Sequence, residues 1–150
     1  MRREMIFIWL ALALGLAVVA YSTLNQIQMP IEGQDTHTDL VGQIIGRETV
    51  GQTFLSRYNH LHRIDIFMAT YARPNTREVT FYLKTAPEAP DDIFALSFNA
   101  SDVEDYDYHS ITFPPIQDSA GQTFFFYIES PSSVEGDAVS IWMQPRDLYP

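Results

Sequence analysis

The residues that could do chemistry are few and scattered along the chain. His60 and His62 are two residues apart, a spacing that on a strand turns both imidazole rings to one face. A zinc or copper site needs three or four converging ligands. Asp65 would lie on the other face, and Asp107 or His109 would have to come from elsewhere in the fold. We therefore expect a buried or strand-end histidine that bonds a backbone carbonyl.

The densest acidic segment is the stretch 101–107, which reads SDVEDYD. Calcium takes about six to eight oxygen ligands, several of them carboxylate, from a flexible loop. Asp102, Asp105 and Asp107 are the candidate calcium ligands. The spacing matches no EF-hand loop, and no glycine lies inside the stretch. A solvated acidic loop is the simpler interpretation, and a calcium site is the alternative.

No catalytic set is evident. Asp65, Glu129 and Asp147 offer the carboxylates that a glycosidase needs as a pair, but spacing along the chain places no two of them at the required separation. Ser119 lacks a glycine-flanked nucleophile elbow and a paired histidine and aspartate. The sequence therefore predicts a protein that is not an enzyme. The sequon that begins at Asn99 matters only in a host that glycosylates it.

Composition excludes several further classes. The 150 residues include 9 Lys and Arg against 19 Asp and Glu, for a net charge of −10. Nucleic-acid binding needs clustered basic residues, so we expect no nucleic-acid partner. The absence of cysteine excludes a disulfide scaffold, a thiolate zinc site and a cysteine nucleophile. With 46% hydrophobic residues, the chain has enough apolar material for a core.

The segment 5–24 contains no charged residue and no proline. Twenty helical residues span about 30 Å, which matches the hydrocarbon core of a membrane. Arg2 and Arg3 precede the segment, and no Lys or Arg follows until Arg47. The positive-inside rule then predicts a cytoplasmic N-terminus and an extracytoplasmic remainder.

Two interpretations of this segment stay open. An uncleaved signal anchor would use the whole run and make a single-pass protein of the cell membrane. A signal peptide cut after Ala20 would release a secreted domain. The run is long for a signal peptide, which favours the anchor. We expect residues 1–24 to be the anchor, residues 25–39 a polar stalk, and residues 40–150 the extracytoplasmic domain.

From Leu40 onward, short apolar runs alternate with turn residues, with no long amphipathic helix. The predicted strands are 44–47, 50–55, 61–70, 78–85, 93–99, 109–113, 123–129 and 138–144. This pattern predicts an all-β fold, an antiparallel β-sandwich or jelly roll of about eight strands.

Alternation within each strand predicts which side chains face inward. The expected inner set is His62, Ile64, Ile66, Met68, Val79, Phe81, Leu83, Phe94, Leu96, Phe98, Ile111, Phe113, Phe124, Phe126, Ile128, Val139, Ile141 and Met143. The opposite faces carry the aromatic residues Phe67, Tyr71, Tyr82, Phe125, Tyr127 and Trp142. Cross-strand packing would explain them, and an exposed platform for sugar rings or a protein partner is the alternative.

The run GQTF at 51–54, followed by the strand 64–67, resembles galactose-binding-like and carbohydrate-binding-module jelly rolls. The later segments TFPPI and DSAGQTFFFYIES are similar to the closing strands of that sandwich, so the resemblance covers residues 40–144. It is a likeness of core positions and turns. It implies an eight-stranded sandwich that binds glycans or cell surfaces, often with a structural calcium. It also implies attachment to bacterial membrane proteins that handle surface polysaccharides.

We therefore expect a membrane-anchored, extracytoplasmic, non-catalytic binding module, with a glycan as its ligand. The expected contact residues are Tyr82, Phe125, Tyr127, Trp142 and Phe67. The alternative is a small structural or interaction subunit of a membrane protein complex, which would dock through its sandwich. No cofactor is expected beyond the calcium named above.

Overall fold

A computed structural model of the chain describes residues 39–143 and the single residue Leu14. The chain divides into two compact units, Met1–Asp35 and Thr36–Pro150, and all of the strands belong to the second. The predicted membrane segment 5–24, and the predicted stalk up to residue 38, lie outside the described residues. Among the residues described, no helix has the length and apolar character that a membrane crossing requires.

Eight strands and one short helical turn make up the described part of the second unit. The strands are β1 (Asp39–Gln43), β2 (Thr49–Leu55), β3 (Leu61–Ala69), β4 (Glu78–Lys84), β5 (Phe94–Asn99), β6 (Asp107–Ile116), β7 (Thr123–Glu129) and β8 (Ser140–Met143). The 3₁₀ turn η1 (Ala100–Asp102) joins β5 to the loop that precedes β6. The expected all-β, antiparallel fold is confirmed.

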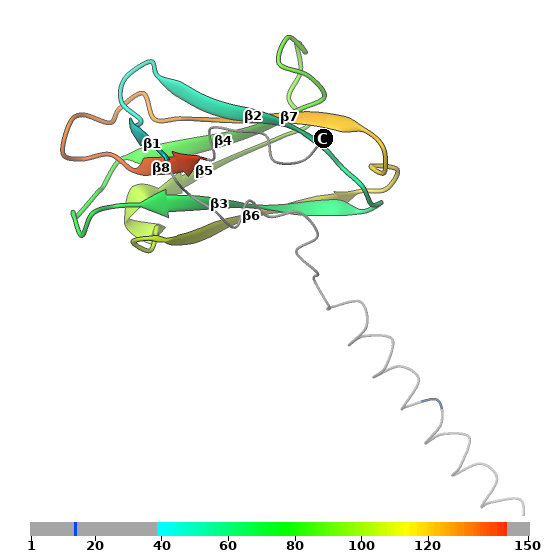
Figure 1. Cartoon of the computed structure of the whole chain (residues 1–150), viewed down its shortest axis with the longest axis horizontal. Coiled ribbons are helices and arrows are strands. Elements are labelled where there is room, and N and C mark those ends of the chain that lie inside the picture. The colour runs from blue at the N-terminus through cyan, green and yellow to red at the C-terminus, as the bar shows by residue number, and fades with distance from the viewer. Residues whose placement is uncertain (1–13, 15–38, 144–150) are drawn as a thin grey trace, which may run out of the picture. The chain divides into compact units, whose positions relative to one another are not determined.

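The strands form two four-stranded antiparallel sheets. Sheet A has the order β1-β8-β3-β6, and sheet B has the order β2-β7-β4-β5. Figure 1 shows β2 and β7 in the upper layer and β3 and β6 in the lower layer. Consecutive strands lie in opposite sheets, except for the hairpin of β4 and β5 within sheet B. The chain thus crosses between the layers repeatedly.

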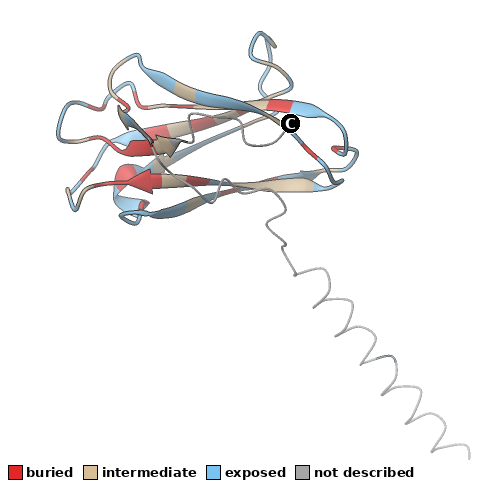
Figure 2. Cartoon of the chain, viewed as in Figure 1, coloured by how far each residue is buried: buried red, intermediate tan, exposed pale blue. Residues whose placement is uncertain are grey.

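The core lies between the two layers, where the inward residues of each strand meet. Buried segments alternate with exposed ones along the strands in Figure 2. The buried cluster consists of Ile44, Ile66, Met68, Val79, Phe81, Leu83, Ala100, Val103, Ile111, Phe113, Phe124, Ile128, Val139 and Ile141. The predicted inner set is therefore largely confirmed. The inner side chains bury apolar area at about 25 cal/mol per Å², which is the main stabilising contribution to the sandwich.

The first predicted strand, 44–47, is wrong. The first strand of the structure is β1, which ends at Gln43. The chain turns shortly after it at Gly46, which has a φ of 58°. The backbone N–H of Ile44 donates to the Val139 carbonyl at 3.0 Å, and its side chain is buried in the core cluster. Its burial is a loop contact, so apolar character alone was misleading here.

Two further expectations need correction at the sheet edges. Leu96 was expected in the core but is 37% exposed, because β5 is an edge strand with a neighbour on one side. Strand β6 was expected to end at Phe113 but continues to Ile116 through Pro114 and Pro115. Proline is tolerated there because β6 is also an edge strand, where a missing N–H breaks no ladder bond.

Candidate functional site

Sheet B turns a row of aromatic side chains away from the core. Along β7, Phe124 and Ile128 are buried, so the alternating residues Phe125 and Tyr127 point to the outer face. Tyr82 occupies the outer face of β4, directly across from Tyr127 in the antiparallel register. We call Phe125, Tyr127 and Tyr82 the aromatic ladder.

The rings of the aromatic ladder stack on one another. The centroids of Tyr82 and Tyr127 lie 4.6 Å apart with an interplanar angle of 7°, and those of Tyr127 and Phe125 lie 5.9 Å apart at 20°. Each side chain is half-buried. An aromatic pair contributes about 0.5–1.5 kcal/mol beyond its buried area. The ring contacts therefore hold the three side chains of the ladder in place.

The tyrosines are flanked by the smallest residues of the neighbouring strands. Gly51 on β2 lies opposite Tyr127, and Ala95 on β5 lies opposite Tyr82. A Cβ on Gly51 would stand 2.5 Å from the Phe126 carbonyl oxygen, so only glycine fits. On one flank the Phe125 ring reaches over Gly51, 2.8 Å from where a Cβ would stand, and on the other flank Ala95 presents only a methyl group.

Charged side chains border the aromatic ladder. The Tyr82 hydroxyl donates to Glu129 Oε1 at 3.0 Å. Lys84 Nζ lies 5.8 Å from the centroid of the Tyr127 ring, in cation–π range, and donates to the Ala89 carbonyl at 2.9 Å. The outer face of sheet B thus combines an apolar strip with both a donor and an acceptor.

The two tyrosine hydroxyls stay protonated well above neutral pH. Burial raises the pKa of Tyr82 above its ordinary value, and its hydrogen bond to Glu129 raises it further. Burial also raises the pKa of Tyr127, and the negative charges of Asp92 and Glu129 add to the effect. Both side chains therefore act as neutral hydrogen-bonding groups.

The outer face of sheet A holds a different set of aromatic residues. Phe67 on β3 meets Tyr108 on β6 edge to face, with centroids 5.2 Å apart. Trp142 lies 6.2 Å from Tyr106, which in turn lies 5.4 Å from Tyr71. Sheet A therefore carries its own aromatic surface, formed partly by loop residues.

The five predicted contact residues consequently fall on opposite sides of the sandwich. Tyr82, Phe125 and Tyr127 come together on sheet B, whereas Phe67 and Trp142 lie on sheet A. The buried core separates the two groups. They cannot form one continuous platform.

The acidic stretch is tied to a neighbouring turn. Asp105 Oδ1 accepts the N–H groups of Thr70 and Tyr71, both at 2.7 Å, and its Oδ2 accepts that of Ala72 at 2.8 Å. Tyr71 and Ala72 have positive φ angles of 55° and 53°, which curl their N–H groups toward one carboxylate. Desolvation alone would raise the pKa of Asp105, but these three bonds outweigh it and lower the pKa.

The other two candidate calcium ligands are placed separately. Asp102 ends η1, and Asp107 begins β6, where its Oδ1 accepts the Tyr108 N–H at 2.7 Å. Within residues 39–143 no group of three or more histidine, aspartate or glutamate side chains is arranged to hold a metal ion. His62 instead contacts the His60 carbonyl oxygen through Nδ1 at 2.7 Å, as expected for a strand-end histidine.

The residues considered for catalysis have structural contacts. Asp65 pairs with Arg63 at 2.6 Å on sheet A, whereas Glu129 lies on sheet B, so the core separates these two carboxylates. Asp147 lies outside the described residues. Ser119 is fully buried, and its Oγ accepts the Leu61 N–H at 3.0 Å and donates to a loop carbonyl.

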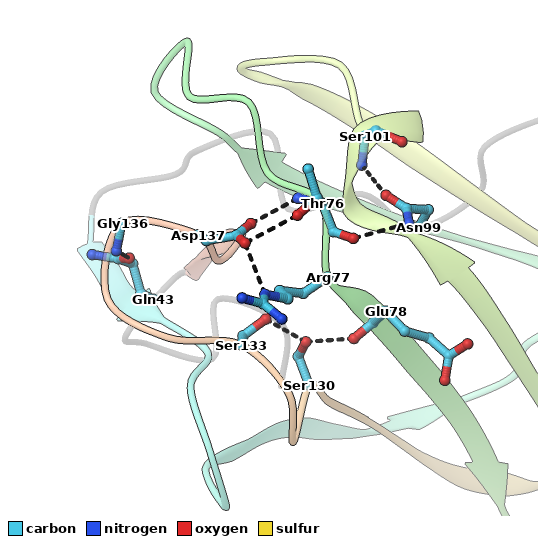
Figure 3. Close-up of polar contacts among 10 residues, drawn as sticks. All are labelled: Gln43, Thr76, Arg77, Glu78, Asn99, Ser101, Ser130, Ser133, Gly136 and Asp137. Carbon is cyan, nitrogen blue, oxygen red and sulfur yellow. Dashed lines mark hydrogen bonds and ion pairs between the residues drawn. The ribbon is translucent and has the colours of Figure 1, made fainter.

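A polar network that the sequence did not suggest joins the loops at one end of the sandwich (Figure 3). Asp137 accepts the Thr76 N–H at 2.7 Å, the Thr76 hydroxyl at 3.0 Å and Arg77 Nε at 2.8 Å. The backbone hydrogen bond from Thr76 is the main reason that the pKa of Asp137 is lowered. Asn99 Nδ2 also donates to the Thr76 carbonyl at 3.0 Å. No local sequence signal marks such a contact, because its partners are far apart along the chain.

Comparison with models of protein families finds no match for this sequence. Comparisons with curated proteins and with solved structures also find none.

Proposed function

We propose that this chain is a non-catalytic binding module that holds a glycan on the outer face of sheet B. The observation that carries the proposal is the aromatic ladder, a stacked and partly exposed strip between Gly51 and Ala95. The apolar C–H face of a sugar ring packs on an aromatic ring, and large apolar surfaces outside the core usually mark interaction sites. Glu129 and Lys84 border the strip and supply an acceptor and a donor for hydroxyl groups.

The finer fold class that we propose is a jelly roll. The strand orders β1-β8-β3-β6 and β2-β7-β4-β5 support it, because each pairs an early strand with a late one. A jelly roll combines eight strands in two sheets through two Greek keys. This class agrees with the resemblance to carbohydrate-binding modules, although a fold by itself does not establish a ligand.

The ligand that fits this face is neutral or carries amino groups. The protein has a net charge of −10, and Asp92 and Glu129 lie near the aromatic ladder. An anionic polysaccharide would be repelled by this field, whereas an uncharged or cationic sugar would not. We further propose that residues 5–24 anchor the module in a membrane and display it on the extracytoplasmic side.

A glycan array probed with the full-length chain in mild detergent tests the binding function. We expect binding to defined neutral or amino sugars, with a loss of about tenfold or more for Tyr82→Ala, which corresponds to about 1.4 kcal/mol. Tyr82→Phe keeps the ring and should retain most of the affinity. Trp142→Ala, on the opposite sheet, is the matched control and should bind like the wild type. No binding to any sugar, or equal loss in both alanine variants, would contradict the proposal.

A second candidate function is a small interaction subunit that docks on a membrane protein through sheet A. Tyr106 and Tyr108 are 49% and 46% exposed, although both take part in ring contacts on that side. Trp142 Nε1 is buried without a hydrogen-bond partner in the described part of the chain. This function predicts that a membrane partner co-purifies in mild detergent and is lost with Tyr106→Ala but kept with Tyr82→Ala.

A further inference from the structure

The two sheets differ in how their edges are protected. An edge strand exposes unpaired N–H and C=O groups, and proteins usually block them with charges, prolines or bulges. In sheet A, the β1 edge has a register shift between Leu40 and Gly42, and the β6 edge contains Asp107, Pro114 and Pro115. In sheet B, the edge strands β2 and β5 contain no charge and no proline. Both also pair with their inner neighbours without any register shift.

Both edges of sheet B are open to solvent. On β5, Ala95, Leu96 and Ser97 are exposed, and on β2 Thr53 is exposed and Leu55 is 49% exposed. Regular, uncharged and exposed edges of this kind are templates for the addition of another strand.

The geometry of sheet B lets its own edges pair with each other across two copies. All three neighbour pairs in the sheet are antiparallel, so β2 and β5 run in opposite directions. Ser56 N–H bonds toward β7, and Ala100 N–H bonds toward the start of β4. Because bonding direction alternates along a strand, Thr53 and Ala95 turn their backbone groups outward. A β2 strand from a second copy can therefore join β5 as an antiparallel neighbour.

The flanking charges identify which edges match. Asp91 precedes β5 and Asp102 follows it, whereas Arg47 precedes β2 and Arg57 follows it. Asp92, next to Asp91, is already paired with Lys84 Nζ at 3.6 Å within the same chain. Two β5 edges placed antiparallel would bring acidic groups together at both ends, which is unfavourable. A β5 edge and a β2 edge instead bring opposite charges together.

One register satisfies both the backbone and the charges. When Ala95 lies opposite Thr53, the acidic segment before β5, which contains Asp91, and the segment after β2, which contains Arg57, meet at one end of the junction. The segments that contain Asp102 and Arg47 meet at the other end, where Glu48 offsets part of the attraction. The same register brings the half-buried side chains of Phe94 and Phe54 together on the inner face.

We propose that copies of this chain associate head to tail, with β2 of one copy adding to β5 of the next. Such a heterologous contact uses two different surfaces, so it generates a closed ring or an open row. Sheet B, and with it the aromatic ladder, continues from copy to copy. The proposal is independent of the ligand that the ladder binds.

Complementary edge variants test this association in the full-length chain, purified in mild detergent and examined by light scattering over a concentration series. Ala95→Pro blocks the β5 edge and Thr53→Pro blocks the β2 edge, because proline removes the outward N–H. We expect the wild type to form larger species as concentration rises and each variant alone to stay monomeric. An equimolar mixture should form dimers and nothing larger, because each variant keeps one open edge. Ala95→Ser and Thr53→Ser are the matched controls and should associate like the wild type.

Several results would overturn the proposal. One is a wild-type protein that stays monomeric throughout the series. Another is association that survives both proline substitutions, which is the result expected if the copies contact each other through residues 5–24. Loss of association in Ala95→Pro but not in Thr53→Pro would indicate pairing of two β5 edges. If a proline variant melts without cooperativity, Leu96→Lys on β5 and Gln52→Lys on β2 are used in place of the two proline variants. The proposal then requires that each lysine variant alone is monomeric and that their mixture forms dimers.

Discussion

The ring of Phe125 lies directly over Gly51 of the neighbouring strand. A Cβ built on Gly51 would stand 2.8 Å from Phe125 Cζ and 2.9 Å from Tyr127 Cβ, well inside normal contact distance. The missing side chain at Gly51 therefore makes room for the end of the aromatic ladder. Glycine within a strand commonly marks such a close approach.

Gly51→Ala should destabilise the protein, because the nearest atom to the new methyl group is the backbone oxygen of Phe126, which cannot move aside cheaply. We expect a loss of about 1–3 kcal/mol, the usual cost of overpacking. Thermal or urea unfolding measures it, with Gln52→Ala on the same strand as the control. Equal stability of the two variants would show that the strand adjusts freely.

Asp137 should stabilise the fold at neutral pH and cease to do so in acid. Its pKa is lowered in the folded state, first by the Thr76 backbone bond, so its contribution is present above the unfolded value of 3.8 and is lost as pH falls through the folded value. Asp137→Asn should lower the melting temperature at pH 7, and the difference from the wild type should shrink towards pH 3. Glu135→Gln, an exposed residue of the same loop, should show neither effect. A difference that is constant with pH would contradict this assignment.

His109 should make the protein sensitive to mild acid. Its ring stacks on Phe98 at 4.3 Å between the edges of the two sheets, and burial lowers its pKa while Asp102 opposes the shift. A lowered folded pKa means that stability is complete above the ordinary value of 6.5 and declines as pH falls below it. His109→Gln should therefore lose less stability than the wild type between pH 8 and pH 5. Parallel curves for the two proteins would exclude His109 as the source.

Calcium should not stabilise the fold through the acidic stretch. Asp105 Oδ1 already accepts two backbone N–H groups and its Oδ2 accepts a third, so a calcium ion would compete with these bonds for the carboxylate. We expect equal melting temperatures in millimolar calcium, in magnesium and in excess chelator. A bound ion at a hundredfold excess over its Kd would add about 2.7 kcal/mol, or a shift of order 10 °C. A shift of that size with calcium alone would restore Asp102, Asp105 and Asp107 as ligands.

The topology prediction concerns residues outside the described part of the chain. External protease should digest the domain on intact cells, because residues 25–150 follow an uncharged segment preceded by Arg2 and Arg3. N-terminal sequencing of the mature protein separates an anchor from a peptide cleaved after Ala20. A domain that is cut only after lysis would reverse the predicted orientation.

The sequence by itself determined most strand positions and the inward residues. Side chains two apart share a face, so the alternation in 123–129 separated Phe124 and Ile128 from Phe125 and Tyr127 without any knowledge of the neighbours. This reasoning failed at Ile44, where burial comes from a loop folded over the core, and at Leu96, where edge position governs exposure. Local pattern contains no information on which strand ends a sheet.

Only the tertiary structure decided which aromatic residues share a surface. Alternation assigns Tyr82 and Trp142 alike to an outer face, but the pairing of β4 with β7 and of β3 with β8 puts them on opposite sheets. The same holds for Asp105 and Asp137, whose partners lie between 33 and 61 residues away along the chain. Strand order and loop contacts are decided by long-range packing. The alternation within one strand is compatible with several possible neighbouring strands, so it does not select among them.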